Sequence, residues 1–417
     1  MITLPNLFKK SQQKIQPGER IVALDIGTEV LKAILFTIKE GEIIVEKVSR
    51  IQQQQNAMDK GIITNLNTVL ENCRLAMREI MDGIDVDRHP KHVVMGIAGE
   101  YIQGVSIIVN YEREQKHEQE VTPKEQAEII SRIHNKILES GKEDLAKRTG
   151  LVNDDIDILH VTITGMEIGG MSVDSLVGFR GKDVKLYFYA SFAPKTYTSA
   201  LQNVSKSLSI NLLGIVSQPF AVARAFQGAR AKEFSGIFVD IGGGTTDVAV
   251  VQRGSVVDTQ MFAFGGRVFT KQIAKELNLD YRHAELRKIK YAEKTLDSKL
   301  ERQVKKVTYP TAQVWMKTLK SALEAAEERD SFPSRIYLCG GGSLLPEIKE
   351  VMMEFPWTKL LPFASVPRIE IIYPNRLSRI TDESKELKYT YDITPASLTL
   401  FALDKISDSK KFNTKNE

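Results

Sequence analysis

Two aspartates that share a local sequence are the residues best placed to do chemistry. Asp25 and Asp240 each end a run of β-branched and apolar residues, and each is followed by Ile-Gly. A carboxylate at a strand end beside glycine lies where backbone can approach a ligand closely. Mg²⁺ prefers oxygen ligands and keeps several waters while touching one or two carboxylates and ligand phosphates, so the pair predicts a hydrated magnesium site. Taken singly, either aspartate is equally typical of a hairpin turn.

Glycine-rich segments provide backbone that can approach anions or flat rings. The segments after the two aspartates contain Gly27 and Thr28, and Gly242, Gly243, Gly244, Thr245 and Thr246. Successive glycine amides can converge on an anion, so we expect these loops to hold phosphate groups. A third cluster follows an apolar strand and comprises Gly340, Gly341, Gly342 and Ser343. Alone, this cluster indicates only the ligand side of a sheet.

Three charged residues are candidates for ligand contacts, and each has an ordinary alternative. Lys32 lies on the strand that follows Asp25, and a turn between them lets its side chain reach a phosphate. A solvated surface lysine is the alternative. Glu285 and Lys288 lie one helical turn apart and can supply polar contacts to a ribose, although such a pair is more often a surface ion pair.

An internal repeat must position these residues. The segments IVALDIGTEVLKAILFTIKEGEIIVEKV and GIFVDIGGGTTDVAVVQRGSVVDTQMF begin at Ile21 and Gly236, about 215 residues apart. Each contains an apolar run, Asp-Ile-Gly, a second apolar run, a glycine turn and a third apolar run, which predicts two successive hairpins. Two such copies, interleaved with helical segments, predict two α/β domains that face each other across a cleft.

Apolar periodicity places the elements between and after the repeats. Residues 65–81 have the spacing of an amphipathic helix, and Thr122-Pro123 has the signature of a helix start. We expect a small α/β insert at about 99–181, with an elaborated edge of the first domain as the alternative. In the last third we expect helices at 284–306 and 311–328, separated by a polar break, and a disordered polar tail.

Composition excludes several classes of protein. The chain has 417 residues, 42% hydrophobic and 26% charged, which is typical of water-soluble globular proteins. A net charge of +4 over this length does not indicate a nucleic-acid partner. Two cysteines, Cys73 and Cys339, cannot build a disulfide framework or a cysteine-rich zinc site, which fits a reducing cytoplasm. We find neither a spanning apolar run nor a secretory signal.

Five segments in order resemble the nucleotide-binding motifs of the actin and sugar-kinase ATPase superfamily. They are DIGTEVLK, SQPFAVARAF, VDIGGGTTDVAVV, FGGRVFTKQIAKEL and LCGGGSLLPEI. Within the superfamily the chain most resembles the FtsA family of bacterial cell-division proteins, and next the PilM family of type IV pilus assembly. Support comes from DKGIITNLNTVLENCRLAMREI, VVMGIAGEYIQG, the insert and AELRK, and the resemblance covers about residues 20 to 403.

The resemblance implies an actin-like α/β fold with two ribonuclease-H-like domains around a nucleotide cleft and an SHS2-like insert. The expected ranges are an N-terminal tail at 1–20, a first domain at 21–98 and 186–217, the insert at 99–185, a second domain at 218–267 and 336–403, a helical subdomain at 268–335 and a tail at 404–417. It also implies bound ATP and Mg²⁺.

The resemblance assigns roles to site residues as well. Asp25 and Asp240 would surround the metal, and Gln218 would orient an attacking water, with a capping or solvent-facing glutamine as the alternative. Gly265 and Gly266 would complete a connecting turn. The third glycine cluster, with Glu285 and Lys288, would surround the adenosine.

The two ends of the chain depart from the FtsA pattern. FtsA proteins usually end in an amphipathic membrane helix, whereas this sequence ends in a polar tail. At the start, Leu4, Leu7 and Phe8 with nearby lysines predict at most a short, weak membrane helix, and a disordered tail is the alternative. The resemblance to FtsA nevertheless implies a cytoplasmic protein, peripheral at the inner face of the cell membrane.

Three functions follow from these expectations. The first is an FtsA-like protein that binds ATP, forms filaments with itself, and links FtsZ to the membrane, with slow hydrolysis at most. Its lysine- and arginine-rich segment 281–306 would receive the acidic FtsZ C-terminal peptide, or would be a solvated helix face. The second is a PilM-like scaffold that docks a peptide of a pilus membrane protein. The third, a small-molecule kinase, lacks a convincing carboxylate base.

Overall fold

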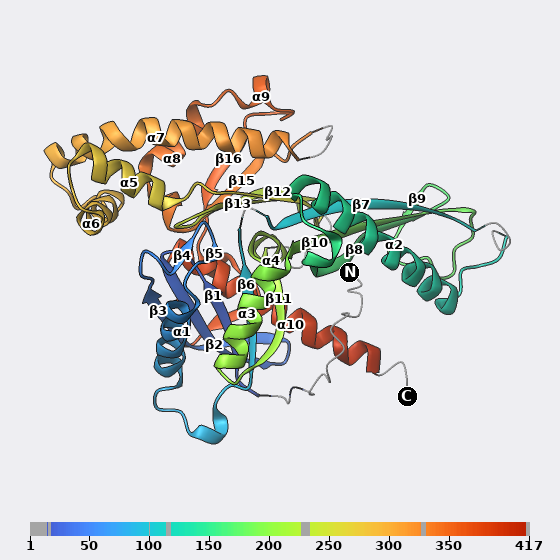
Figure 1. Ribbon diagram of the computed structural model, residues 1–417. Coiled ribbons are helices and arrows are strands. Elements are labelled where there is room, and N and C mark those ends of the chain that lie inside the picture. The colour runs from blue at the N-terminus through green and yellow to red at the C-terminus, as the bar shows by residue number, and fades with distance from the viewer. Residues whose placement is uncertain are drawn as a thin grey trace.

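The computed structural model describes residue 15 and residues 18–99, 101–113, 118–226, 234–326 and 331–413. Two mixed sheets form its framework (Figure 1). The first sheet has the order β11-β6-β1-β2-β3-β17. Its strands are β1 Ile21–Ile26, β2 Val30–Lys39, β3 Glu42–Gln52, β6 His92–Ile97, β11 Asn211–Ser217 and β17 Ile380–Asp382.

The second sheet contains the second copy of the repeat and the strands of the insert. Its order is β16-β15-β12-β13-β14-β7-β10-β8-β9. The strands are β7 Gln103–Glu112, β8 Ile156–Ile168, β9 Met171–Val173, β10 Asp183–Pro194, β12 Gly236–Ile241, β13 Thr246–Gln252, β14 Ser255–Phe262, β15 Arg335–Cys339 and β16 Arg368–Ile371. A short separate hairpin pairs β4 Met58–Asp59 with β5 Ile62–Ile63.

The repeat predicted from the sequence is confirmed by strand pairing. β1, β2 and β3 pair antiparallel in succession, and β6 joins β1 in parallel. β12, β13 and β14 pair in the same way, and β15 joins β12 in parallel. Both Asp-Ile-Gly segments therefore end the first strand of equivalent motifs.

Helices cover both faces of the first sheet because residues of β1 alternate between two cores. Val22 and Leu24 pack under α1 Leu66–Met81 and α3 Lys195–Ser207, whereas Ile21 and Ala23 pack under α4 Gln218–Ala225 and α10 Ile393–Asn413. α1 matches the predicted amphipathic helix, and Asn65 caps it by accepting a hydrogen bond from the amide of Thr68 at 3.2 Å.

The insert joins the second sheet instead of forming a separate one. α2 Pro123–Thr149 covers its strands, and Thr122 caps α2 as its sequence predicts. β7 meets β14 at one residue pair, Gly104 with Thr259, where a side chain on Gly104 would clash with Tyr189. β10 continues past the expected boundary at 185 to Pro194, because its whole length pairs with β7 or β8. Figure 1 shows this part of the sheet projecting away from the other helices.

The helices of the last third differ from the two predicted at 284–306 and 311–328. The structure has α5 Gly266–Glu276, α6 Tyr281–Ala292, α7 Ser298–Glu324, α8 Pro346–Glu354 and α9 Trp357–Leu360. α7 begins after Asp297, which accepts hydrogen bonds from two amides at 2.9 Å, and it continues through Pro310. Its buried face includes Val304, Ala312 and Trp315, and this burial outweighs the amide that proline removes.

The chain returns to the first sheet at its C-terminal end, although 336–403 was expected to belong to the second domain. β17 pairs with β3, and α10 packs on the first sheet. α10 also extends to Asn413, into the tail expected to be disordered from 404, because a helix already nucleated by its buried part propagates at little cost. We call the first sheet with the β4–β5 hairpin, the loop that leads to it, α1, α3 and α10 the first unit, and β12–β16 with α5–α9 the second unit.

Short 3₁₀ turns complete the described elements. They are η1 Val86–Arg88, η2 Asn153–Asp155, η4 Gly341–Leu344, η5 Pro374–Arg376 and η6 Thr390–Asp392. Among the helices in the described ranges, none has the length and apolar character needed to cross a bilayer. The residues of the predicted N-terminal membrane helix, including Leu4, Leu7 and Phe8, lie outside the described residues.

Trp315 provides a test of the core of the second unit. Its side chain is fully buried, and its indole Nε1 donates to Thr246 Oγ1 at 3.0 Å. We expect Trp315→Ala to lower the free energy of unfolding by about 3–5 kcal/mol because it leaves a cavity. Val314→Ala, at an exposed neighbouring position, should change it by less than about 0.5 kcal/mol. Urea unfolding followed by circular dichroism measures both, and equal effects would contradict this packing.

Candidate functional site

Asp25 lies at the centre of a buried polar cluster between the two sheets. Strand register places Lys32 directly opposite Asp25, and the Lys32 Nζ lies 2.9 Å from Asp25 Oδ2. The Lys32 side chain is only 12% exposed, so it is not the solvated surface lysine of the alternative interpretation. Burial lowers the pKa of Lys32, but Asp25, and then Asp240 and Asp392, raise it by more, so the net shift is upward. The ammonium group therefore stays charged at neutral pH.

Gln218 joins this cluster from the first residue of α4. Its Nε2 donates to Asp25 Oδ1 at 2.7 Å, and the residue is buried. A β-carbon on Gly96, at the end of β6, would lie 3.0 Å from Gln218 Cγ. The absence of a side chain at Gly96 thus makes room for Gln218, which neither caps the helix nor faces solvent.

Asp240 occupies the equivalent position in the second unit. Its Oδ2 accepts a hydrogen bond from the hydroxyl of Thr394, at the start of α10. Asp247 lies opposite Asp240 in register, and its buried Oδ1 has no hydrogen-bond partner among the described residues. Burial raises the pKa of Asp240, and it raises that of Asp247 further, where the charges of Asp240 and Asp25 add to the effect. A cation bound beside them would relieve this unfavourable concentration of carboxyl groups.

The two glycine loops that follow these aspartates contact each other. A β-carbon on Gly243 would clash with the side chain of Glu29, and one on Gly244 would lie 2.6 Å from Thr28 Oγ1. The loop beginning at Gly242 is a tight turn in which the Gly242 amide donates to the Thr245 carbonyl at 2.9 Å. The close approach explains why glycines, and no larger residues, occupy 243 and 244.

The hydroxyl group of Thr246 is hydrogen-bonded to two neighbouring residues of the fold. Its Oγ1 donates to the Phe264 carbonyl at 2.5 Å and accepts from Trp315. The turn at Gly265 and Gly266 lies against the same loop, since the Gly266 amide donates to the Gly242 carbonyl at 2.8 Å. The segments that the sequence links to phosphate and to the connecting turn are therefore in contact.

Glu285 and Lys288 form a partly buried ion pair and not a fully exposed surface pair. Lys288 Nζ lies 2.8 Å from Glu285 Oε2 and also donates to the Gly266 carbonyl at 3.1 Å. Thr270 donates its hydroxyl to Glu285. The pair thus ties α6 to the first turn of α5, next to the loop that begins at Gly242.

The third glycine cluster lies over Asp240. Gly340 has φ +80°, and a β-carbon there would clash with the Asp240 carboxylate. Ser343 is buried and donates to the Gly340 carbonyl at 2.7 Å, and Gly342 is buried as well. Gly341 is exposed, and a β-carbon on it would lie 4.0 Å from the ring of Tyr391.

Sequence reasoning missed several residues of this site. Tyr391 stacks on Tyr389 with ring centroids 4.9 Å apart, and the Lys32 ammonium lies 5.9 Å from the Tyr391 centroid. Tyr391 and Thr394 come from a segment about 150 residues after Asp240 that carries no glycine motif of its own. Asp247 had a usable signal, because the hairpin of the repeat places it opposite Asp240.

The donor set fits a hydrated divalent cation and a phosphate chain. Both Asp25 oxygens and one Asp240 oxygen already accept hydrogen bonds, which leaves second lone pairs for metal-bound water. Mg²⁺ usually keeps such waters. The glycine loops bring backbone amides to the same place, and Lys32 supplies a fixed positive charge.

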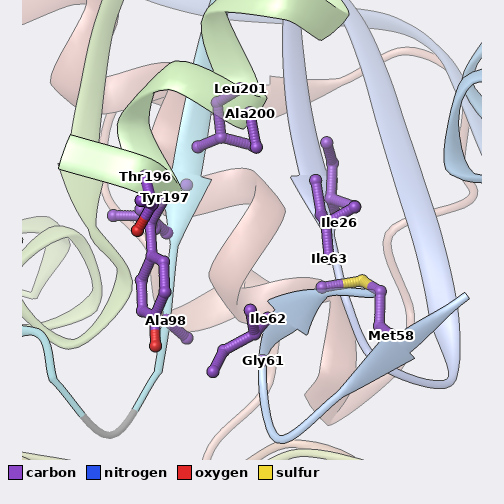
Figure 2. A pocket seen from close by; sticks show the side chains of 12 residues that line it. Ile26, Met58, Gly61, Ile62, Ile63, Ala98, Thr196, Tyr197, Ala200 and Leu201 are labelled. Carbon is purple, nitrogen blue, oxygen red and sulfur yellow. The ribbon is translucent and has the colours of Figure 1, made fainter. Parts of the chain in front are cut away.

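A separate apolar pocket of about 260 Å³ lies beside the first sheet. Figure 2 shows α3, with Tyr197 and Leu201, on one side and the β4–β5 hairpin, with Met58 and Ile63, on the other. The hairpin also contacts the first glycine loop, because the Gly61 amide donates to Thr28 Oγ1 at 3.2 Å. The hairpin therefore both contacts the first glycine loop and lines the pocket.

Comparison with known proteins finds sequences similar to this chain. A family model described as "Cell division protein FtsA" matches residues 237–389. The cell division protein FtsA of Neisseria meningitidis serogroup B is 24% identical over 286 residues, which is 68% of this chain and 64% of that protein. The FtsA of Enterococcus hirae is 22% identical over 408 residues, covering 91% and 86%. The match to the Neisseria protein thus spans slightly less than two thirds of its length.

A solved structure shares the fold. The "PilM-PilN type IV pilus biogenesis complex" aligns with a TM-score of 0.62 and 15% identity, covering 94% of this chain and 99% of the matched chain. The two copies of the strand motif, the insert and the five nucleotide-type segments agree with this likeness. By sequence the chain is similar to FtsA cell division proteins, and its fold is that of the actin-like ATPases.

Proposed function

We propose that the chain binds ATP with Mg²⁺ between the two units and uses the bound nucleotide to control assembly with itself and with partners. The observation that carries the proposal is the convergence of Asp25, Lys32 and Asp240 from equivalent motifs on two different sheets. Asp25 alone is enough to pair with Lys32. The cluster also contains the buried carboxyl groups of Asp240 and Asp247. The excess of buried carboxylate favours a cation-dependent ligand.

Each residue of the cluster has a role that its position supports. Lys32 holds a phosphate oxygen, and the amides of Gly243 and Gly244 bind the phosphate chain, since the Gly242 amide already donates to the Thr245 carbonyl. The Nε2 of Gln218 donates to Asp25, so the side-chain carbonyl oxygen of Gln218 can accept a hydrogen bond from a water. Mg²⁺, when bound, supplies charge neutralisation of the phosphates. An amide orients water but does not take its proton, so hydrolysis is slow at most.

A groove of about 590 Å³ between α5 and α7 supports an acidic partner peptide. Its lining includes the apolar Val268, Leu277, Val307 and Val314, together with Lys306 and Glu276. The apolar part of this lining fits the apolar face of an amphipathic segment, and Lys306 can pair with an acidic residue of that segment. We propose that such a segment, of the kind expected for the FtsZ C-terminus, docks here, and that the protein links division machinery to the inner face of the cell membrane as a peripheral protein.

The pocket beside the first sheet favours a second candidate function, that of a PilM-like scaffold. Its apolar lining suits the side chains of a peptide from a membrane-protein partner. A scaffold of this kind binds nucleotide and its peptide without forming filaments. The two candidates therefore differ in self-association, not in the nucleotide site.

Calorimetric titration with ATP tests the nucleotide site. We expect the affinity of the unaltered protein to rise with Mg²⁺, and Asp25→Asn or Asp240→Asn to lower the affinity for ATP with Mg²⁺ by about tenfold or more, or about 1.4 kcal/mol. Asp87→Asn, which removes an exposed carboxylate elsewhere, serves as the control. Absence of binding heat in the unaltered protein, with or without Mg²⁺, would reject the proposal.

Charge reversal tests the groove. Lys306→Glu should weaken capture of an FtsZ C-terminal peptide by about tenfold, because the reversed charge repels an acidic segment. Lys299→Glu, near the start of α7 and outside the groove, should leave capture unchanged. Fluorescence anisotropy with a labelled peptide measures both affinities. Equal affinities for all three proteins would exclude this surface.

Self-association separates the two candidate functions. Sedimentation and negative-stain microscopy with ATP and Mg²⁺, with and without anionic vesicles, should yield ordered polymers if the FtsA-like proposal holds. A species that remains monomeric under all these conditions would instead support the PilM-like scaffold.

A further inference from the structure

Arg267, the second residue of α5, bridges the two units through its side chain. Its Nη2 donates to the Thr28 carbonyl at 2.9 Å, and its Nη1 donates to the Met58 carbonyl at 2.7 Å and to the Gln55 carbonyl at 3.3 Å. Its Nε pairs with the Glu29 carboxylate. All four acceptors belong to the first unit, although Arg267 belongs to the second.

The backbone of Arg267 is anchored on the other side. Its amide donates to the Gly243 carbonyl at 2.8 Å, next to the bond from Gly266 to Gly242. One residue thus connects the glycine loop of the second unit to that of the first. A guanidinium cannot lose its charge, and here its side chain is only 10% exposed, so separating it from these acceptors is costly.

Glu29 receives a second bond from the opposite unit. Tyr281, at the start of α6, donates its hydroxyl to Glu29 Oε1 at 3.0 Å. Burial and then the Glu29 charge raise the pKa of Tyr281, so the hydroxyl remains a donor at neutral pH. Gln52 of the first unit holds the other carboxylate oxygen at 3.2 Å. Glu29 is therefore fixed between α5, α6 and β3.

The same bonds determine the position of the β4–β5 hairpin. Met58 accepts from Arg267, and Gly61 donates to Thr28. The Gln53 amide donates to the Glu29 carbonyl at 2.7 Å, which extends the connection to the start of this loop. The hairpin forms one wall of the apolar pocket in Figure 2. A movement of Arg267 away from the first unit would therefore release that wall.

We propose that Arg267 is an interdomain clasp that must release before the two units can separate. The clasp holds the cleft closed, limits the rate at which nucleotide enters and leaves, and couples cleft closure to the shape of the apolar pocket. The part that concerns nucleotide rests on the function proposed above. The clasp itself does not require nucleotide. The clasp and the proposed nucleotide function can therefore be tested separately.

Hydrogen exchange on the full-length, nucleotide-free protein tests the clasp. Arg267→Met should speed exchange about tenfold or more at the amides of Ala57, Gly61 and Thr64, while amides of β1 and β6 keep their protection. Tyr281→Phe should give a smaller increase at the same amides. Arg282→Met, which alters an exposed arginine next to Tyr281, is the control and should have no effect.

Two results would overturn the clasp. The first is unchanged exchange in the loop and hairpin of a folded Arg267→Met protein. The second is a uniform loss of protection that includes β1 and β6, because this would show that Arg267 only stabilises the fold. Arg267→Lys provides a further check, since lysine keeps the charge but cannot reach four acceptors at once, and it should fall between the unaltered protein and Arg267→Met.

Stopped-flow fluorescence with a labelled ATP analogue and Mg²⁺ tests the coupling to nucleotide. Arg267→Met should raise both the association and the dissociation rates by about tenfold, with a smaller change in Kd. A change in Kd with an unaltered association rate would contradict the proposal that the clasp limits nucleotide entry. If the unaltered protein bound no analogue, the proposed nucleotide function would fail, whereas the exchange result would still decide the clasp.

Discussion

The arrangement of the molecule depends on a lysine held in the interior. The Lys32 ammonium is tolerated there because Asp25 lies 2.9 Å away and because Asp240 and Asp392 add negative potential. The β1–β2 ladder fixes Lys32 opposite Asp25, so the pair is built into strand register and does not depend on a flexible loop. Around it, buried carboxyl groups outnumber buried positive charges, since Arg50 already neutralises Asp392. This imbalance supports the proposal that a cation and an anionic ligand bind here together.

The duplicated strand motif explains how two distant segments form one site. Each copy delivers an aspartate and a glycine loop to the end of its first strand, and the two loops meet at Gly243 and Gly244. The copies differ in the element that packs against each loop. The first unit places the β4–β5 hairpin against its loop, and the second unit places the start of α5 there. Arg267 bonds the start of α5 to the β4–β5 hairpin, and through this contact the proposed clasp would couple the cleft to the pocket beside the first sheet.

Sequence reasoning succeeded where the signal was local and failed where contacts were distant. The repeat, the strand-end positions of both aspartates and the helix capped by Asn65 depend on neighbouring residues, and pairing and capping confirm them. The predicted break near Pro310 was wrong because a buried helix face decided the outcome. Thr394 and Tyr391 reach the site only because α10 crosses to the first sheet, and nothing in their own segment indicates a ligand. The roles of Asp25, Asp240 and all the other candidate site residues in binding a ligand stay predictions.

A crystal structure with Mn²⁺ and a non-hydrolysable ATP analogue tests the central claim most directly, because Mn²⁺ replaces Mg²⁺ and is located by anomalous scattering. The account predicts one metal peak between the carboxylates of Asp25 and Asp240, bridged by water, with the terminal phosphates against Lys32 and the loop at Gly242–Gly244. Density for the analogue elsewhere, or a metal bound away from both aspartates, would contradict it.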